Sequence, residues 1–167
     1  MSMILVAYAS KHGSTQGIAE HIARHLYERG LEAEARSVEA VHDLGTPDAV
    51  ILGSAVYAGS WMKEATEFAH RFADVLSALP VWLFTSGPLG EHVEDEEEQP
   101  RQLEELRETL HPRGHEIFFG ALAREQLSFG ERMIAKAVKA PEGDFRDWDA
   151  IAAWAEAIAD ELASTVA

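Results

Sequence analysis

The sequence predicts an α/β protein, a three-layer α/β/α sandwich in which helices cover both faces of a five-stranded parallel sheet. Continuous apolar runs such as Met3–Tyr8 (MILVAY) and Pro80–Thr85 (PVWLFT) are typical of strands buried on both faces. Between such runs lie stretches whose apolar residues recur every three or four positions, as in an amphipathic helix. The alternation of the two patterns favours parallel strands joined by right-handed crossovers.

The expected elements follow one another along the whole chain. Strands are expected at Met3–Tyr8, Leu31–Val38, Asp48–Ser54, Pro80–Thr85 and Gly114–Leu122. Helices are expected from Ser14 up to Gly30 and at Lys63–Leu79, Pro100–Leu110, Glu131–Ala140 and Trp148–Val166. Because the chain has 167 residues and shows no repeat or linker, we expect one domain spanning residues 1–167.

The composition excludes several classes of function. Fourteen Lys and Arg against 29 Asp and Glu give a formal net charge of −15, which repels nucleic acid at long range. The absence of cysteine excludes disulfides, thiolate chemistry and Cys-ligated zinc or iron–sulfur clusters. The eight His residues lack the spacing of a metal site, so no metal is expected. Any redox activity would therefore need a bound cofactor.

The apolar N-terminus has the wrong pattern for a targeting segment. No basic stretch precedes it, and it is too short to span a membrane as a helix. We therefore expect a cytoplasmic location and no transmembrane segment.

The loop after the first strand has the composition of a phosphate-binding turn. In parallel α/β sheets ligands bind at the carboxyl ends of the strands. Here the chain reads Ser10-Lys11-His12-Gly13-Ser14-Thr15 and runs into a helix, whose N-terminal amides and hydroxyls could donate to a phosphate. The alternative is that Ser14 or Thr15 only caps the helix. The sequence contains no G-x-G-x-x-G and no G-x-x-x-x-G-K-[ST].

This loop, Ser10–Thr15, resembles the phosphate motif of flavodoxins, T/S-x-T-G-N/S-T, in the position directly after the first strand. It departs from that motif at His12, where a hydroxyl residue is usual. The resemblance implies a flavodoxin-like fold with strand order 2-1-3-4-5. It also implies FMN as the cofactor, held non-covalently.

Two further loops fit a flavin under this resemblance. The second follows the third strand and offers Tyr57 and Trp61, among small residues, as aromatic faces for the isoalloxazine ring. The alternative is that these two side chains only close the core. The third loop, Thr85-Ser86-Gly87-Pro88-Leu89-Gly90, would flank the other side of the ring. The expected FMN-binding residues are Ser10, Lys11, His12, Gly13, Ser14, Thr15, Ser54, Ala55, Val56, Tyr57, Ala58, Gly59, Trp61, Ser86, Gly87, Pro88 and Leu89.

Weaker motifs indicate a subgroup of the family. Phe119–Leu122 (FGAL) and Gly143–Trp148 (GDFRDW) are similar to the flavodoxin-domain proteins that include the menaquinone-dependent protoporphyrinogen IX dehydrogenases. The resemblance implies an FMN-dependent electron carrier with a redox partner protein. A first alternative is an FMN-dependent oxidoreductase acting on a quinone or porphyrin substrate. A second alternative is a flavin-free module that works by binding partners.

Overall fold

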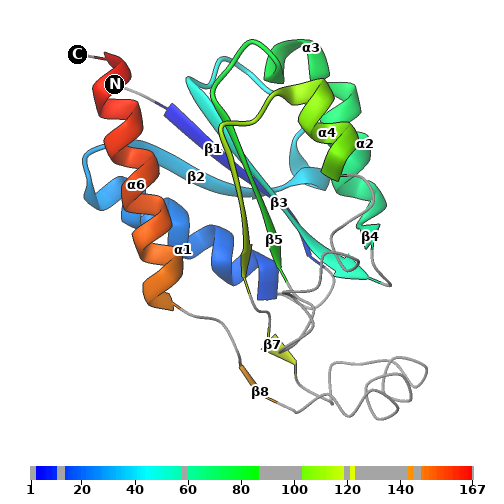
Figure 1. Ribbon diagram of the computed structural model, residues 1–167, viewed down its shortest axis with the longest axis horizontal. Coiled ribbons are helices and arrows are strands. Elements are labelled where there is room, and N and C mark those ends of the chain that lie inside the picture. The colour runs from blue at the N-terminus through cyan, green and yellow to red at the C-terminus, as the bar shows by residue number, and fades with distance from the viewer. Residues whose placement is uncertain are drawn as a thin grey trace.

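The computed structural model describes residues 3–10, 14–57, 60–86, 103–118, 121–122, 143–144 and 148–166. In this part of the chain the predicted three-layer sandwich is present (Figure 1). The predicted helix at 131–140 lies outside the described residues.

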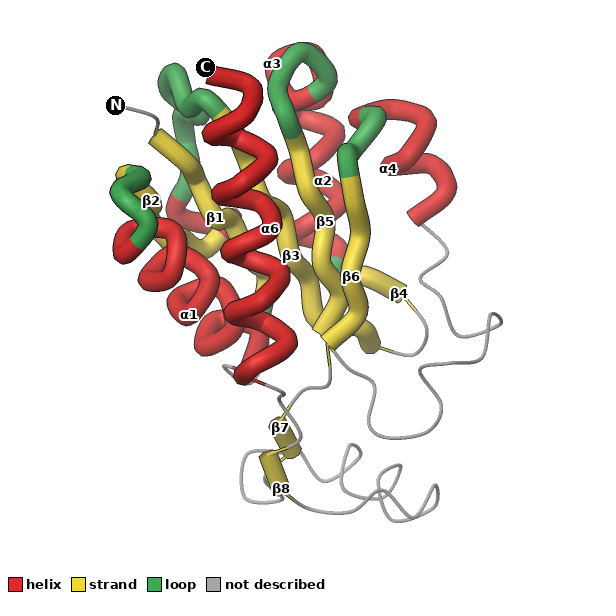
Figure 2. The backbone as a smooth tube through the Cα atoms, turned by 60° about the vertical axis from the view of Figure 1, so that its left-hand side comes forward, coloured by secondary structure: helices red, strands yellow, loops and turns green. Residues whose placement is uncertain are grey.

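The central sheet has the predicted topology. Its five parallel strands run in the order β2-β1-β3-β5-β6, which is the expected order 2-1-3-4-5. Figure 2 shows these strands side by side, with the ends of β3, β5 and β6 together at the lower edge. The strands are β1 (Met3–Ala9), β2 (Glu32–Ser37), β3 (Ala49–Tyr57), β5 (Val81–Ser86) and β6 (Gly114–Phe118).

Three short strands lie off this path. β4 (Ser60–Trp61) pairs antiparallel with the end of β3. β7 (Ala121–Leu122) and β8 (Gly143–Asp144) pair antiparallel with each other and form a separate small sheet.

Helices cover the two faces of the sheet in the described part of the chain. One face carries α1 (Ser14–Glu28) and α6 (Trp148–Val166), while the other carries α2 (Lys63–Arg71), α3 (Ala73–Leu76) and α4 (Leu103–Leu110) (Figure 1). A 3-10 turn, η1 (Val38–Ala40), follows β2.

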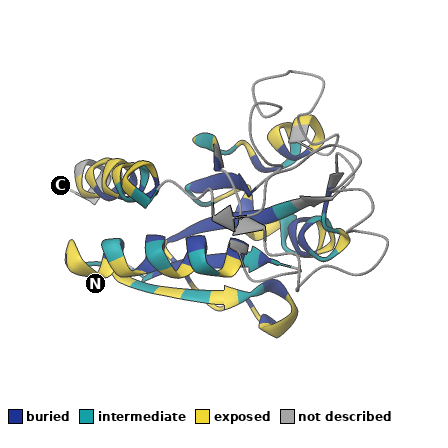
Figure 3. Cartoon of the chain, turned by 90° about the horizontal axis from the view of Figure 1, so that it is seen from below, coloured by how far each residue is buried: buried dark blue, intermediate teal, exposed yellow. Residues whose placement is uncertain are grey.

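The core lies in two clusters, one on each face. Because successive side chains of a strand point to opposite faces, Leu5 and Ala7 pack toward α2, and Ile4 and Val6 pack toward α1 and α6. All four are buried. Figure 3 shows the buried strands between helices whose outer sides are exposed. Apolar contact on both faces explains why the central strands read as unbroken apolar runs.

The structure corrects three predicted boundaries. The helix predicted at Lys63–Leu79 is interrupted at Phe72, whose φ of −108° and ψ of 18° are not helical, although Leu76 beyond it is still fully buried. The strand predicted at Gly114–Leu122 ends at Phe118. The strand predicted at Asp48–Ser54 continues to Tyr57, because Val56 and Tyr57 find pairing partners on β4.

β2, at one edge of the described sheet, presents charged side chains to solvent. Glu32, Glu34 and Arg36 are exposed, while Ala33 and Ala35 between them are half-buried against the α1 and α6 side. The Arg36 guanidinium donates to a carboxylate oxygen of Glu34 at 2.8 Å.

Candidate flavin site

The sheet brings the predicted loops together at its carboxyl edge. In the register of the sheet, Ala9 pairs with Ser54 and Ser54 with Thr85, so residues at or near the carboxyl ends of β1, β3 and β5 form one row. Ala55 and Ser86 pair in the next row. Residues more than 70 positions apart in the sequence therefore border one site, as predicted for a parallel sheet.

Thr15 lies at the start of α1, the helix that leaves β1. Its side chain is completely buried, and its Oγ1 has no hydrogen-bond partner among the described residues. A buried hydroxyl without a partner costs about 1–3 kcal/mol of desolvation. A helix start also supplies unpaired backbone N–H groups and a positive dipole end. The position therefore suits an anionic ligand that accepts hydrogen bonds.

Ser86, the last residue of β5, is the second such hydroxyl. It is 2% exposed, and its Oγ also lacks a partner in the described part of the chain. Alternation along β5 puts Ser86 on the same face of the sheet as Phe84, which is the α1 face. Both unpartnered hydroxyls thus belong to the face on which α1 begins. A cofactor with phosphate and ring acceptors fits this pair.

The second loop is anchored by Ser54. The Ser54 hydroxyl donates to the carbonyl oxygen of Ala55 at 2.8 Å and accepts from the backbone N–H of Met62 at 2.9 Å. Met62 is the residue before α2. One buried hydroxyl thereby joins the end of β3 to the start of α2 and fixes the two ends of the loop between them.

The Trp61 side chain is held in place by hydrogen bonds that lead through Thr85 to His115. The Trp61 side chain is 3% exposed, and its indole N–H donates to Thr85 Oγ1 at 2.9 Å. Thr85 Oγ1 lies 2.8 Å from Nε2 of His115 on β6. The indole only donates, so the hydroxyl accepts from Trp61; its own proton can go to Nε2, and in that arrangement the ring proton of His115 is on Nδ1.

The His115 ring is kept neutral by its surroundings. Burial and, second, the positive charge of Arg107 lower its pKa to about 4. At neutral pH the ring therefore has one nitrogen that accepts and one that donates, and Thr85 Oγ1 bridges Trp61 and His115.

The structure describes only part of the predicted site. Ser10, Thr15, Ser54, Ala55, Trp61 and Ser86 are described with their side chains, and all lie at the carboxyl edge. For Ser14, Val56 and Tyr57 the backbone alone is described. The predicted residues outside the described ranges are Lys11, His12, Gly13, Ala58, Gly59, Gly87, Pro88 and Leu89.

The sequence analysis placed Thr85 in the third loop but missed its bond to Trp61, and it missed His115 and Arg107 as parts of the site's surroundings. A signal was present, because Arg107, His111 and His115 follow one another at intervals of four residues across the end of α4. In the described ranges no group of three His, Asp or Glu side chains could hold a metal ion. Among those same residues no helix is long and apolar enough to cross a membrane.

The strand order and the helices on both faces of the sheet are those of a flavodoxin-like α/β protein. The family model described as Flavodoxin domain matches residues 5–149. The chain therefore belongs to the flavodoxin domain family, which implies a flavin cofactor.

Known proteins are similar to the chain in sequence and in three-dimensional structure. Protoporphyrinogen IX dehydrogenase (quinone) of Escherichia coli K12 is 21% identical over 169 residues, which cover 93% of each chain. A flavodoxin variant from Pseudomonas aeruginosa superposes with a TM-score of 0.59 at 17% identity, covering 93% of this chain and 97% of its own. The rubredoxin oxygen:oxidoreductase of Desulfovibrio gigas gives a TM-score of 0.68 at 13% identity, and this chain spans 37% of its length.

Proposed function

We propose that the protein binds FMN non-covalently at the carboxyl edge of the sheet and uses it to carry electrons. The observation that supports this most directly is the pair of buried, unpartnered hydroxyls, Thr15 Oγ1 and Ser86 Oγ, on the α1 face. FMN, when bound, supplies the electron-transfer chemistry that a chain without cysteine lacks.

The roles of the chain's own residues follow from their places. Thr15 and the first amides of α1 would hold the phosphate, with Ser10 beside them at the end of β1. Ser86 would donate to a polar atom of the cofactor. Tyr57 is the candidate for stacking on the ring, and Trp61, whose indole N–H is bonded to Thr85, would support the loop and border the ring.

The test compares FMN with riboflavin, which has the same ring system and no phosphate. Protein freed of any bound flavin is titrated with each compound, and flavin fluorescence is followed. We expect FMN to bind at least a hundredfold more tightly than riboflavin, because the phosphate contacts belong to FMN alone. Equal affinities for FMN and riboflavin would contradict a phosphate site at α1. If the protein bound neither compound, the alternative of a flavin-free module that binds partners would be favoured.

A second candidate is an oxidoreductase that passes electrons to a quinone. The similarity to protoporphyrinogen IX dehydrogenase (quinone) favours it, because that similarity extends over 93% of both chains rather than over the flavin loops alone. The FMN-loaded protein would be supplied with protoporphyrinogen IX and menaquinone. Formation of protoporphyrin that requires both FMN and the quinone would establish the enzyme, and its absence alongside rapid exchange with a redox protein would establish the carrier.

A further inference from the structure

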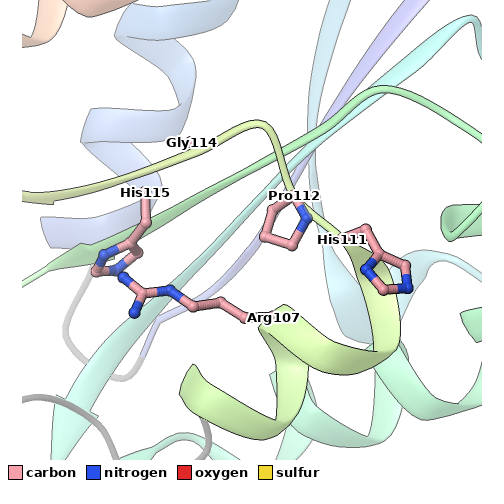
Figure 4. A pocket seen from close by; sticks show the side chains of 5 residues that line it. All are labelled: Arg107, His111, Pro112, Gly114 and His115. Atoms are coloured by element: carbon pink, nitrogen blue, oxygen red, sulfur yellow. The ribbon is translucent and has the colours of Figure 1, made fainter.

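A concave site lies between α4 and β6, lined by residues that belong to none of the three predicted flavin loops. It is an open pocket of about 430 Å³ lined by Arg107, His111, Pro112, Gly114 and His115 (Figure 4). It lies on the face of the sheet that α2 and α4 cover, opposite to α1. A pocket of this volume is in the range of small-molecule sites.

Arg107 gives this pocket a positive charge within a protein of net charge −15. Among the described residues, none of the ion pairs involves Arg107. Its guanidinium lies beside the imidazole of His115 (Figure 4). An arginine side chain presents a planar fork of donors whose geometry matches a carboxylate.

His115 adds a second polar group to the pocket, its ring nitrogen Nδ1. Its Nε2 is engaged by the Thr85 hydroxyl, so the remaining ring atom that can bond a ligand is Nδ1, which carries the proton when Thr85 donates to Nε2. A ring held neutral in this tautomer does not compete with Arg107 as a second cation, but it donates a hydrogen bond.

The other residues that line the pocket determine which kind of anion it can bind. Pro112 and the Gly114 backbone are uncharged and carry no long polar side chain. His111 closes the pocket at the end of α4, where its φ of 50° is a left-handed conformation that few non-glycine residues adopt. This is the conformation in which many helices end, and the His111 N–H closes the last turn on the Arg107 carbonyl oxygen at 3.1 Å.

We propose that this pocket binds an organic carboxylate, which pairs with the Arg107 guanidinium, accepts from His115 and rests its apolar part on Pro112 and Gly114. None of its lining residues belongs to a predicted flavin loop, and its occupation requires no flavin. Its contact with these loops is the hydrogen-bonded chain from His115 through Thr85 to Trp61.

The hydrogen bonds from His115 through Thr85 to Trp61 give a way to measure binding in the pocket. Full-length protein at pH 7 and constant ionic strength is titrated with benzoate, and NMR follows the His115 ring and the Trp61 indole N–H. Benzamide, which has the same shape without the charge, and inorganic phosphate, an anion without an apolar part, are titrated in parallel. We expect saturable shifts of both resonances with benzoate, and affinities at least tenfold weaker for the other two compounds.

Variants separate the pocket from the general charge of the surface. Arg107→Gln should weaken benzoate binding at least tenfold, and Arg107→Lys, which keeps the charge and loses the fork, should weaken it less. Arg113→Gln is the matched control, because the Arg113 guanidinium lies over the Trp82 ring, 5.6 Å from its centroid, and does not line the pocket. It should leave the affinity within twofold.

The outcomes against the proposal are distinct. Absence of saturable shifts with benzoate, equal binding of benzamide or phosphate, or equal losses in Arg107→Gln and Arg113→Gln would each overturn it. Because the titration is done without added flavin, none of these results depends on the proposed FMN site.

Discussion

The ring of Phe84 fills the space that a side chain at Gly53 would need. A Cβ placed on Gly53 would lie 2.0 Å from Cζ of Phe84. The two residues are direct partners on β3 and β5, and the Phe84 ring also contacts Trp154 of α6, with centroids 6.1 Å apart. Glycine at this position lets the aromatic cluster beneath α6 extend across β3, immediately before the second flavin loop.

Replacing Gly53 with alanine should therefore destabilise the fold. The expected loss in the free energy of unfolding is about 1–3 kcal/mol, because the ring or the backbone has to move. Urea denaturation measures it. The double variant Gly53→Ala, Phe84→Leu should recover part of the loss, and Gly114→Ala, whose Cβ would lie 3.2 Å from Trp82 Cδ1, should cost less. An unchanged urea midpoint for Gly53→Ala would be inconsistent with this packing.

Thr15→Val should separate cofactor affinity from stability. Losing a charge-assisted hydrogen bond to the FMN phosphate should weaken FMN binding tenfold to a hundredfold, which is about 1.5–3 kcal/mol. The flavin-free protein should be no less stable than wild type, since the hydroxyl has no partner to lose among the described residues. Fluorescence titration and thermal denaturation measure the two effects.

Thr66→Val is the matched control for that experiment. The Thr66 hydroxyl donates to the Lys63 carbonyl oxygen at 3.0 Å on α2, on the other face of the sheet. It should leave FMN affinity unchanged. If both variants bound FMN as wild type does, Thr15 would be only a helix-cap residue.

Thr85→Val should break the buried chain beneath the second loop. The substitution keeps the shape but leaves the Trp61 indole N–H and His115 Nε2 without their shared partner. The expected cost is about 1–3 kcal/mol in the free energy of unfolding. Hydrogen exchange of the Trp61 indole N–H should become faster in the variant. Unaltered exchange would mean that the bond to Thr85 does not hold the indole in solution.

Lowering the pH should reduce the free energy of unfolding through the protonation of His115. Its pKa is about 4 in the fold against 6.5 in the unfolded chain, so between these values the unfolded state binds a proton that the native state does not. Stability from this group is complete above pH 6.5 and falls as the pH drops, by about 3 kcal/mol at pH 4. The stability difference between wild type and His115→Gln should decrease by that amount from pH 7 to pH 4, as measured by urea denaturation.

An NMR titration gives an independent view of the same group. The His115 ring should stay unprotonated when the pH is lowered to about 5. A midpoint near 6.5 would show that burial does not desolvate the ring.

The sequence was sufficient for the architecture because the central strands are apolar on both faces. Met3–Ala9 and Val81–Ser86 contact helices on either side, so their composition carries the signal of a parallel sheet. Boundaries were less predictable. The continuation of β3 to Tyr57 depends on pairing with Trp61, and the interruption at Phe72 occurs without Gly or Pro. Both are tertiary effects that no local pattern carries.

The site was predictable where neighbouring residues act together and less so where distant ones meet. A hydroxyl-rich loop before a helix indicated Thr15, which the structure shows as buried and unpartnered among the described residues. Trp61 could be proposed as a flavin contact, but not its bond to Thr85, 24 positions away. His115 belongs to no motif, and the contacts that surround it form only when β6 pairs with β5.

The charges of β2 bear on how the protein behaves at high concentration. In the sheet as described, β2 pairs with β1 on one side, and its other side is where a strand from a second molecule could add. If β2 of a second molecule paired with β2 in parallel register, Glu32 and Glu34 would lie next to the same residues of the other molecule. Both pairs of like charges would then lose water of hydration. The apolar, β-branched runs of β1 and β3 have the composition that amyloid stacking favours. The charged side chains of the edge strand β2 thus oppose fibril growth by a chain whose β1 and β3 segments favour aggregation.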